Sequence, residues 1–195
     1  MDASVWGPAL WDALFCVAFK KRPDDAASDS MIAQLLETLV DVIPCKHCRR
    51  SYRKYVEAFP IPTRFTSKDI ALWLWRCKDR VNQKLGKPYK CFPDVERRYM
   101  SFHCILSEVA ALDLLIMMSM VATGENCAAV ARFAGLLGQL LRHVLGDEFA
   151  TRLVQCSAYS TEPKALQNAL SACMHDQLTV RGVPMPTSDH ARAKV

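Results

Sequence analysis

Glycine is scarce in this chain, with 7 residues among 195, and no segment alternates apolar and polar residues as a half-buried strand does. Both absences argue against a β-sheet protein. Hydrophobic residues make up 51% of the chain, which is enough to bury a core and excludes a disordered or fibrous protein. The net charge of +5 is too small and too scattered to predict a nucleic-acid partner. We therefore expect an all-α protein of one domain or two small ones.

Signals for export or membrane insertion are also missing. The first residues carry no basic segment before an apolar run, so no cleaved secretory signal is predicted. The longest apolar stretch, residues 105–122, contains Glu108 and Asp113, and charges near the centre of a membrane-spanning helix are costly. We expect this stretch to be a buried helix of an intracellular protein that has no membrane partner.

Apolar residues recur at helical spacing along most of the chain. Ser28 or Asp29 is expected to cap the second helix, and Thr66 or Ser67 the fourth. Aromatic residues and recognisable motifs become rare near residue 104, which predicts a domain boundary there, between residues 1–104 and a helical extension over 105–180. A loose tail is expected over 181–195. The predicted helices cover about residues 4–20, 28–43, 45–59, 67–85, 94–99, 105–122, 125–145, 147–156 and 162–178.

Nine cysteines are present, and two of them form a CxxC motif. Cys45 and Cys48 follow Pro44 at the start of a predicted helix that continues with basic residues. A helix N-terminus with adjacent cations favours a thiolate, which thiol–disulfide exchange requires. The spacing also suits half of a zinc site, whose other ligands would be two of His47, Cys91, His103 and Cys104. Five further cysteines are expected to be buried and unreactive: Cys16, Cys77, Cys127, Cys156 and Cys173.

Four local features follow one another in the first half of the chain. They are WGPALWDAL at 6–14, PCKHC at 44–48 with Tyr52, Trp73-Leu74 followed by VNQKLGKP at 81–88, and Cys91 followed by VERRY at 95–99 and Cys104. In this order they resemble the Erv/ALR family of FAD-dependent sulfhydryl oxidases, particularly the short forms encoded by large DNA viruses. The resemblance covers about residues 4–104, and VNxxLGKP is its most specific piece.

The resemblance implies a bundle of four helices plus a short fifth that binds FAD. Client thiols would pass electrons through Cys45 and Cys48 to FAD and then to O2, giving H2O2. Cys48 would lie against the flavin and act as a low-pKa leaving group, Cys45 would exchange with clients, and Cys91 and Cys104 would form a structural disulfide. The implied cofactor contacts are Gly7, Trp11, Phe15, Tyr52, Lys78, Val81, Asn82, Lys87 and Tyr99.

Two positions depart from the family pattern. Phe15 and Lys78 stand where the family has histidines that contact the cofactor. Phe15 can still stack on a ring, and Lys78 can offer charge to a phosphate or a cation–π contact to adenine. A scaffold or binding protein that has lost its flavin is therefore the alternative to an active oxidase.

The rest of the chain bears on partners and location. Neither terminus carries a CxxC or CxC that would serve as a shuttle pair, so direct oxidation of clients at Cys45 is expected. Family members are commonly dimers, and the apolar second half suits a dimer interface; some insect-virus members append a comparable helical domain. The implied location is the cytoplasm or nucleus of an infected cell, or a virion.

Overall fold

The computed structural model describes residues 3–21, 25–88, 90–100, 114 and 117–180, except for the side chains of Val5, Met174 and residues 176–180. All regular structure in these ranges is helical, which confirms the all-α prediction. The boundary predicted near residue 104, most of the predicted 105–122 helix and the 181–195 tail lie outside the described residues. The helices are α1 (Ala3–Phe19), α2 (Ala26–Val42), α3 (Lys46–Ala58), α4 (Ser67–Lys84), α5 (Phe92–Met100), α7 (Cys127–Leu140), α8 (Arg142–Leu145), α9 (Asp147–Gln155), the 3-10 helix η1 (Cys156–Tyr159) and α10 (Pro163–Val180).

Helix caps explain where α2 and α4 begin. Thr66 caps α4 as predicted, and its hydroxyl and the Asp69 carboxylate form a capping box. The cap of α2 is Asp25 and not Ser28 or Asp29, because the Asp25 carboxylate accepts hydrogen bonds from the N–H groups of the first turn. Asp29 instead forms a buried ion pair with Lys21, at 2.9 Å, and so joins the end of α1 to α2.

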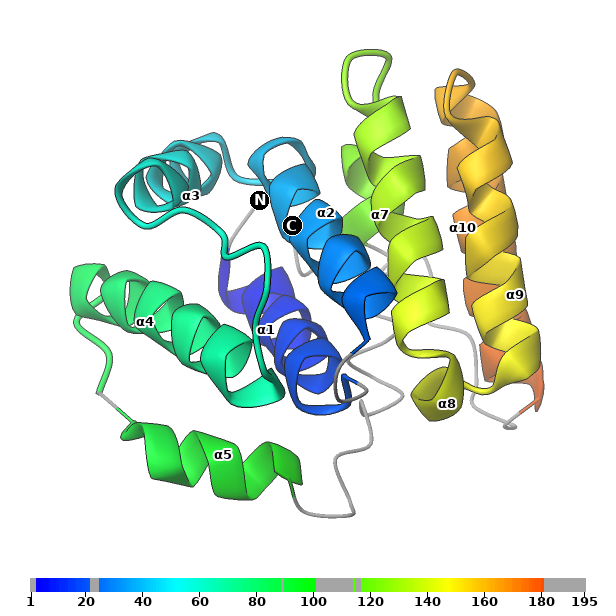
Figure 1. Cartoon of the computed structure of the whole chain (residues 1–195). Helices are drawn as coiled ribbons and strands as arrows, with labels where there is room; N and C mark the ends of the chain where they lie inside the picture. Colours follow the sequence, from blue (N-terminus) through cyan, green and yellow to red (C-terminus); the bar gives the residue numbers. More distant parts are fainter. Residues whose placement is uncertain (1–2, 22–24, 89, 101–113, 115–116, 181–195) are drawn as a thin grey trace.

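The two halves of the chain share one apolar core. The core contains fully buried side chains from both, such as Phe15 in α1 and Phe133 in α7. In Figure 1, α2 lies between the other helices of the first half and the α7–α10 layer, and it packs against α3 and α7. The division into domains at residues 1–104 and 105–180 stays a prediction. The described parts of both ranges bury apolar surface in the same core.

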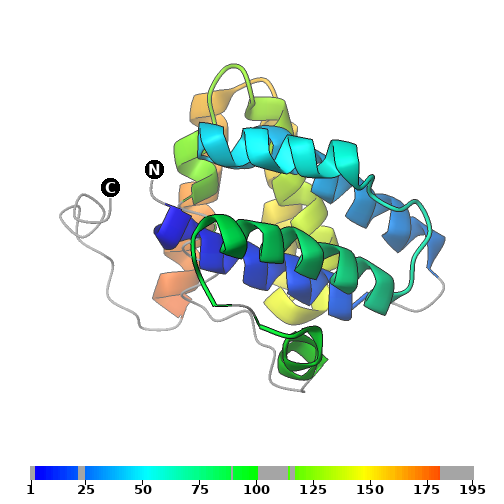
Figure 2. The same cartoon turned by 90° about the vertical axis from the view of Figure 1, so that its left-hand side faces the viewer.

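The five described helices of the first half make two sets of contacts. Helix α1 packs against α4 and α5, and α2 packs against α3. Figure 2 shows α3 running across the molecule above α4, with α5 below them. None of the described helices combines the length and the apolar character that a bilayer crossing requires.

Candidate functional site

Cys45 is the N-cap of α3, so its sulfur lies among the free N–H groups of the first helical turn. The Sγ atom accepts a hydrogen bond from the Cys48 N–H at 3.3 Å. Arg49, one turn into the helix, donates from Nη1 to the carbonyl oxygens of Ile43 at 2.6 Å and Pro44 at 3.3 Å. The guanidinium therefore fixes the turn that delivers Cys45 to the helix start.

The two thiols of the CxxC motif differ in acidity. Burial opposes ionisation of Cys45, but hydrogen bonds from the Cys48 thiol and from the N–H groups of Cys48 and His47 lower the pKa of Cys45. Burial, and then the adjacent Cys45 sulfur, raise the pKa of Cys48 to about 12. The low-pKa Cys48 expected from the sequence is thus not found in the reduced pair, because burial disfavours its thiolate and Cys48 donates its proton to Cys45.

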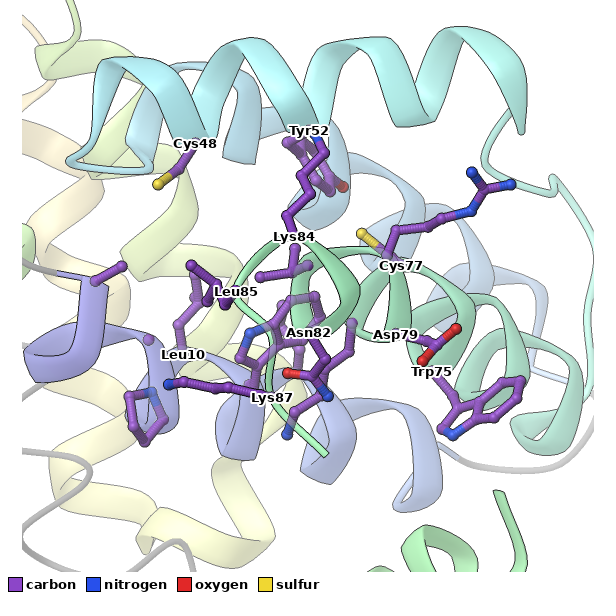
Figure 3. A pocket seen from close by; sticks show the side chains of 18 of the residues that line it. Leu10, Cys48, Tyr52, Trp75, Cys77, Asp79, Asn82, Lys84, Leu85 and Lys87 are labelled. Atoms are coloured by element: carbon purple, nitrogen blue, oxygen red, sulfur yellow. The ribbon is translucent and has the colours of Figure 1, made fainter. Parts of the chain in front are cut away.

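A pocket of about 760 Å³ opens beneath Cys48. Its walls come from α1, the end of α2, α3, α4, α5 and the connection between α4 and α5. In Figure 3, Cys48 and Tyr52 project from α3 toward the pocket, while Asn82, Lys84 and Leu85 approach from the end of α4. Cys45 does not line this pocket. The CxxC therefore presents one sulfur to the pocket and the other outside it.

Most of the predicted cofactor residues meet at this pocket. Phe15 is the exception: it is fully buried and does not line the pocket, and its ring stacks on that of Tyr99 at a centroid distance of 5.1 Å. The Lys78 Nζ atom lies 5.7 Å from the Trp11 ring centroid and 5.4 Å from that of Phe15. The predicted residues that line the pocket are Gly7, Trp11, Tyr52, Lys78, Val81, Asn82, Lys87 and Tyr99.

The segment at 81–88 brings Asn82 and Lys87 together at the end of α4. Gly86 has φ +61°, and the Gly86 and Lys87 N–H groups donate to the carbonyls of Gln83 and Asn82. This is the Schellman arrangement, which uses glycine because a side chain disfavours positive φ. The Asn82 side chain is half-buried beside the pocket, and its amide has no hydrogen-bond partner in the described part of the chain.

A polar cluster fastens α5 to α1 at another wall of the pocket. The Tyr99 hydroxyl donates to Asp12, and Arg98 contacts the same carboxylate at 3.3 Å. Burial, reinforced by the hydrogen bond and the charge of Asp12, raises the pKa of Tyr99 well above its usual value. Tyr99 therefore stays a neutral donor that keeps α5 in place.

Several lining residues were not predicted as site residues. Trp6, Leu10 and Leu14 appear in the sequence as one apolar stripe of α1, which indicates burial but does not distinguish a core from a pocket wall. The Trp6 indole N–H is buried and has no hydrogen-bond partner among the described residues. The remaining unpredicted residues that carry charge are Asp79, Arg80, Lys84, Lys90, Asp94 and Arg98.

The residues present suit a large ligand that combines a flat apolar group with an anionic one. Gly7 is buried, yet a Cβ added there would meet no atom within 4 Å beyond its chain neighbours, so the pocket approaches the backbone of α1. The Trp6 indole N–H is buried without a hydrogen-bond partner among the described residues, and the Asn82 amide lines the same pocket, so both can bind polar atoms of a ligand. Lysines and arginines outnumber the carboxylates among the lining residues, which suits a diphosphate.

The other cysteine predictions are settled only in part. Cys91 is exposed and its thiol donates to Asp94, at 2.9 Å, while Cys104 lies outside the described residues, so their disulfide stays a prediction. The five cysteines predicted to be buried are all buried. Of the zinc ligands considered, His103 and Cys104 also lie outside, and the described residues contain no group of three potential metal ligands.

Comparisons with known proteins place part of the chain. Neither the curated proteins nor the solved structures gave a match. A protein-family model did: residues 8–100 match that of the Erv1/Alr family. The match ends at the last described residue of α5 and includes the CxxC motif and most of the pocket walls. It supports the assignment of residues 8–100 to the Erv1/Alr family.

Proposed function

We propose that this protein is an FAD-linked sulfhydryl oxidase that forms disulfide bonds in client proteins and passes the electrons to O2, giving H2O2. The observation that carries the proposal is the placement of the CxxC motif. Cys48 lines a pocket large enough for a dinucleotide cofactor, while Cys45 caps the same helix outside that pocket. The family match over residues 8–100 agrees with this chemistry.

The first exchange takes place at Cys45. In the oxidised protein, a client thiolate attacks the Cys45 Sγ atom, the bond to Cys48 breaks, and its electron pair goes to Cys48. A second client thiolate then attacks the client sulfur bound to Cys45, and Cys45 leaves as a thiolate. The helix N-terminus and the Cys48 N–H stabilise this leaving group, because both favour negative charge on the Cys45 sulfur. The client gains one disulfide and the CxxC pair gains two electrons.

The remaining oxidation needs a redox cofactor. Bound FAD would accept the pair of electrons and deliver it to O2, a reaction that protein side chains cannot perform. The apolar side of the pocket, with Trp6, Leu10 and Tyr52, suits the flavin ring near Cys48. Lys78 and Lys87 would bind the phosphates, and the Asn82 amide would pair with a polar group of the cofactor.

Other parts of the proposal rest on the resemblance. We place the protein among the forms encoded by large DNA viruses, acting as a homodimer in an infected cell or virion on clients that contain dithiols. A flavin-free scaffold with the same fold is the competing proposal, and the observation that favours it is Phe15, which packs away from the pocket at a position where the family has a cofactor-contacting histidine.

Reconstitution with FAD separates the two proposals. The full chain should bind FAD, turn yellow and consume oxygen in the presence of dithiothreitol. Cys45→Ser and Cys48→Ser should each abolish oxygen consumption. Cys127→Ser is the matched control, because Cys127 lies in α7, does not line the pocket, and donates its thiol hydrogen to the Tyr159 carbonyl. Protein that stays colourless and inactive after reconstitution would support the scaffold. Flavin binding with activity that survives Cys48→Ser would refute the assigned role of the CxxC motif.

A further inference from the structure

The exposed side of helix α3 is strongly basic. Five of its 13 residues are lysine or arginine, and Glu57 in the last turn is its one acidic residue. Cys48 and Tyr52 project from the other side of the helix into the pocket (Figure 3). Four of the five cations are exposed, and their spacing along a helix places them on one side. We call these four residues the α3 basic face: Lys46, Arg50, Arg53 and Lys54.

These charges are not neutralised within the described part of the chain. The side chains of Lys46, Arg50 and Lys54 form no ion pair or hydrogen bond there. Arg53 has one acidic neighbour, Asp41 of α2, at 3.8 Å, and the two side chains are 58% and 55% exposed. An exposed pair of this kind contributes little stability. The α3 basic face therefore has unused positive charge that a partner can meet.

The stability of α3 does not explain this charge. A helix N-terminus favours acidic residues, yet the first turn of α3 has none and begins with Lys46. Lys46 and Arg50, and Arg50 and Lys54, are like-charge pairs four residues apart, which destabilise a helix. The helix is held instead by its buried side, where the Tyr52 and Tyr55 hydroxyls donate to backbone carbonyls of α2 and α4. A local cost of this kind is typical of a functional surface.

The α3 basic face begins beside the sulfur that exchanges with clients. Cys45 caps α3, is partly exposed and does not line the pocket, and Lys46 follows it directly. At the rise of an α-helix, Lys46 and Lys54 lie about 12 Å apart along the axis. An extended peptide covers this distance with about four residues. A chain whose thiol reaches Cys45 can therefore place its next few residues along the α3 basic face.

We propose that the α3 basic face docks acidic residues that flank the reactive thiol of a client protein. The inference rests on the proposed function, because it names the class of client that the oxidase accepts. Carboxylates near the client cysteine would be attracted to Lys46, Arg50, Arg53 and Lys54 and would bring the thiol to Cys45. A nucleic acid has the negative charge but no thiol, so it would leave Cys45 without a use. Since the cations are exposed, we expect their main effect on the rate of encounter and on its salt dependence.

The test isolates exchange at Cys45 and requires neither flavin nor oxygen. The full chain with Cys48→Ser reacts with peptides whose single cysteine is bonded to thionitrobenzoate in a mixed disulfide. The Cys45 thiolate attacks the peptide sulfur, the old disulfide bond breaks, and coloured thionitrobenzoate leaves with the electron pair. Its absorbance gives the rate. The rate for Cys45→Ser/Cys48→Ser is subtracted, because the exposed Cys91 can also react.

Two peptides of equal length are compared, one with glutamates and one with lysines beside the cysteine. At low ionic strength the glutamate peptide should react about tenfold faster, because the α3 basic face attracts one peptide and repels the other. In about 1 M salt, where charges are screened beyond roughly 3 Å, the ratio of the two rates should approach one. This measurement needs no change in the α3 basic face.

Two matched substitutions then locate the preference. Arg50→Glu should lower the ratio at least threefold, and Lys54→Glu is a second variant with the same expectation. Lys164→Glu is the control, because Lys164 is an exposed cation of α10 and the change in net charge is identical. It should leave the ratio unchanged. Any effect of a substitution on the acidity of Cys45 cancels, since both peptides react with the same sulfur.

The outcomes separate this inference from the proposed function. Equal rates for the two peptides at low ionic strength would overturn the docking of acidic clients, and so would a ratio that Arg50→Glu and Lys164→Glu lower equally. Retention of a short DNA duplex that Arg50→Glu abolishes, without a preference between the peptides, would assign the α3 basic face to nucleic acid instead. Oxygen consumption by the FAD-reconstituted wild-type chain with dithiothreitol, an uncharged thiol, tests the oxidase function alone.

Discussion

Replacing Gly138 by alanine tests whether the two halves of the protein unfold as one unit. An alanine Cβ at this position would lie 2.7 Å from the backbone oxygen of Ala150 and 2.9 Å from the Leu153 Cβ. The backbone oxygen cannot move without displacing α9, so the clash should cost about 3 kcal/mol, at the upper end for overpacking. Removing a helical glycine returns up to about 1 kcal/mol. The net loss is therefore about 2 kcal/mol, or a Tm lower by roughly 4–8 °C.

Gly135, one turn earlier in α7, provides the control. Its alanine Cβ would meet the Ser157 Cβ at 3.3 Å, a contact that a shift of a few tenths of an ångström in the exposed residue Ser157 of η1 relieves. Gly135→Ala should therefore lie within about 1 kcal/mol of the wild type and tend toward greater stability, because the helix-propensity gain offsets a mild contact.

Tryptophan fluorescence makes the experiment informative about domains. All four tryptophans lie in the first half, at positions 6, 11, 73 and 75, whereas Gly138 lies in the second. If the shared core makes the protein cooperative, urea unfolding of Gly138→Ala should shift to the same extent by fluorescence and by far-ultraviolet circular dichroism. A shift in circular dichroism with an unchanged fluorescence midpoint would show that residues 1–104 unfold independently and would refute this reasoning.

Three other predictions follow from charges and hydrogen bonds. The rate at which iodoacetamide modifies Cys45 should rise with pH with a midpoint below 9.0, the usual thiol pKa, whereas Cys48, with a pKa of about 12, stays protonated at neutral pH. Mass spectrometry of samples alkylated at each pH measures the two rates. Equal reactivity of Cys45 and Cys48 would contradict the predicted difference in pKa. Lys21→Met should lower the free energy of unfolding in urea by about 3 kcal/mol, because it leaves the buried Asp29 carboxylate without its closest partner; a loss under about 1 kcal/mol would mark the pair as no better than an exposed one. Lys78→Met should weaken FAD binding by about tenfold or more in fluorescence titrations, with Lys78→Arg near wild type; equal affinities would exclude a role for this charge.

The helices were predictable because their signals are local. Apolar spacing predicted α1 to α5, and Thr66 was one of two residues predicted to cap α4. The start of α2 was not predictable in the same way. Asp25 and Asp29 can both cap a helix, and the choice depends on Lys21, which recruits Asp29 from the end of α1. Tertiary contacts decide between caps that are locally equivalent.

The pocket was only partly predictable. The family resemblance located Trp11, Asn82 and Lys87, because the motifs that carry them are short and specific. The contact it implies for Phe15 stays a prediction, because this side chain is fully buried against Tyr99 and does not line the pocket. Trp6 and Leu10 were expected in the core, since a helical stripe records that a side chain is buried but not what it packs against. They line a pocket because α3 and α4, far from them in sequence, stand apart at that point.

The high pKa of Cys48 and its role as a leaving group are compatible, because they belong to different states of the pair. Burial is the first cause of the raised pKa, and the other two are the hydrogen bond and the charge of the Cys45 sulfur. In the mixed disulfide the Cys45 sulfur is bonded to a client and carries no charge, so both of those causes disappear. The pKa of Cys48 must then fall, because burial is the one raising cause that remains and a backbone hydrogen bond still lowers the pKa. Cys48 is therefore a better leaving group during exchange than its pKa in the reduced pair suggests. When the next step releases Cys45 from the client, Cys45 is again the more acidic thiol of the pair.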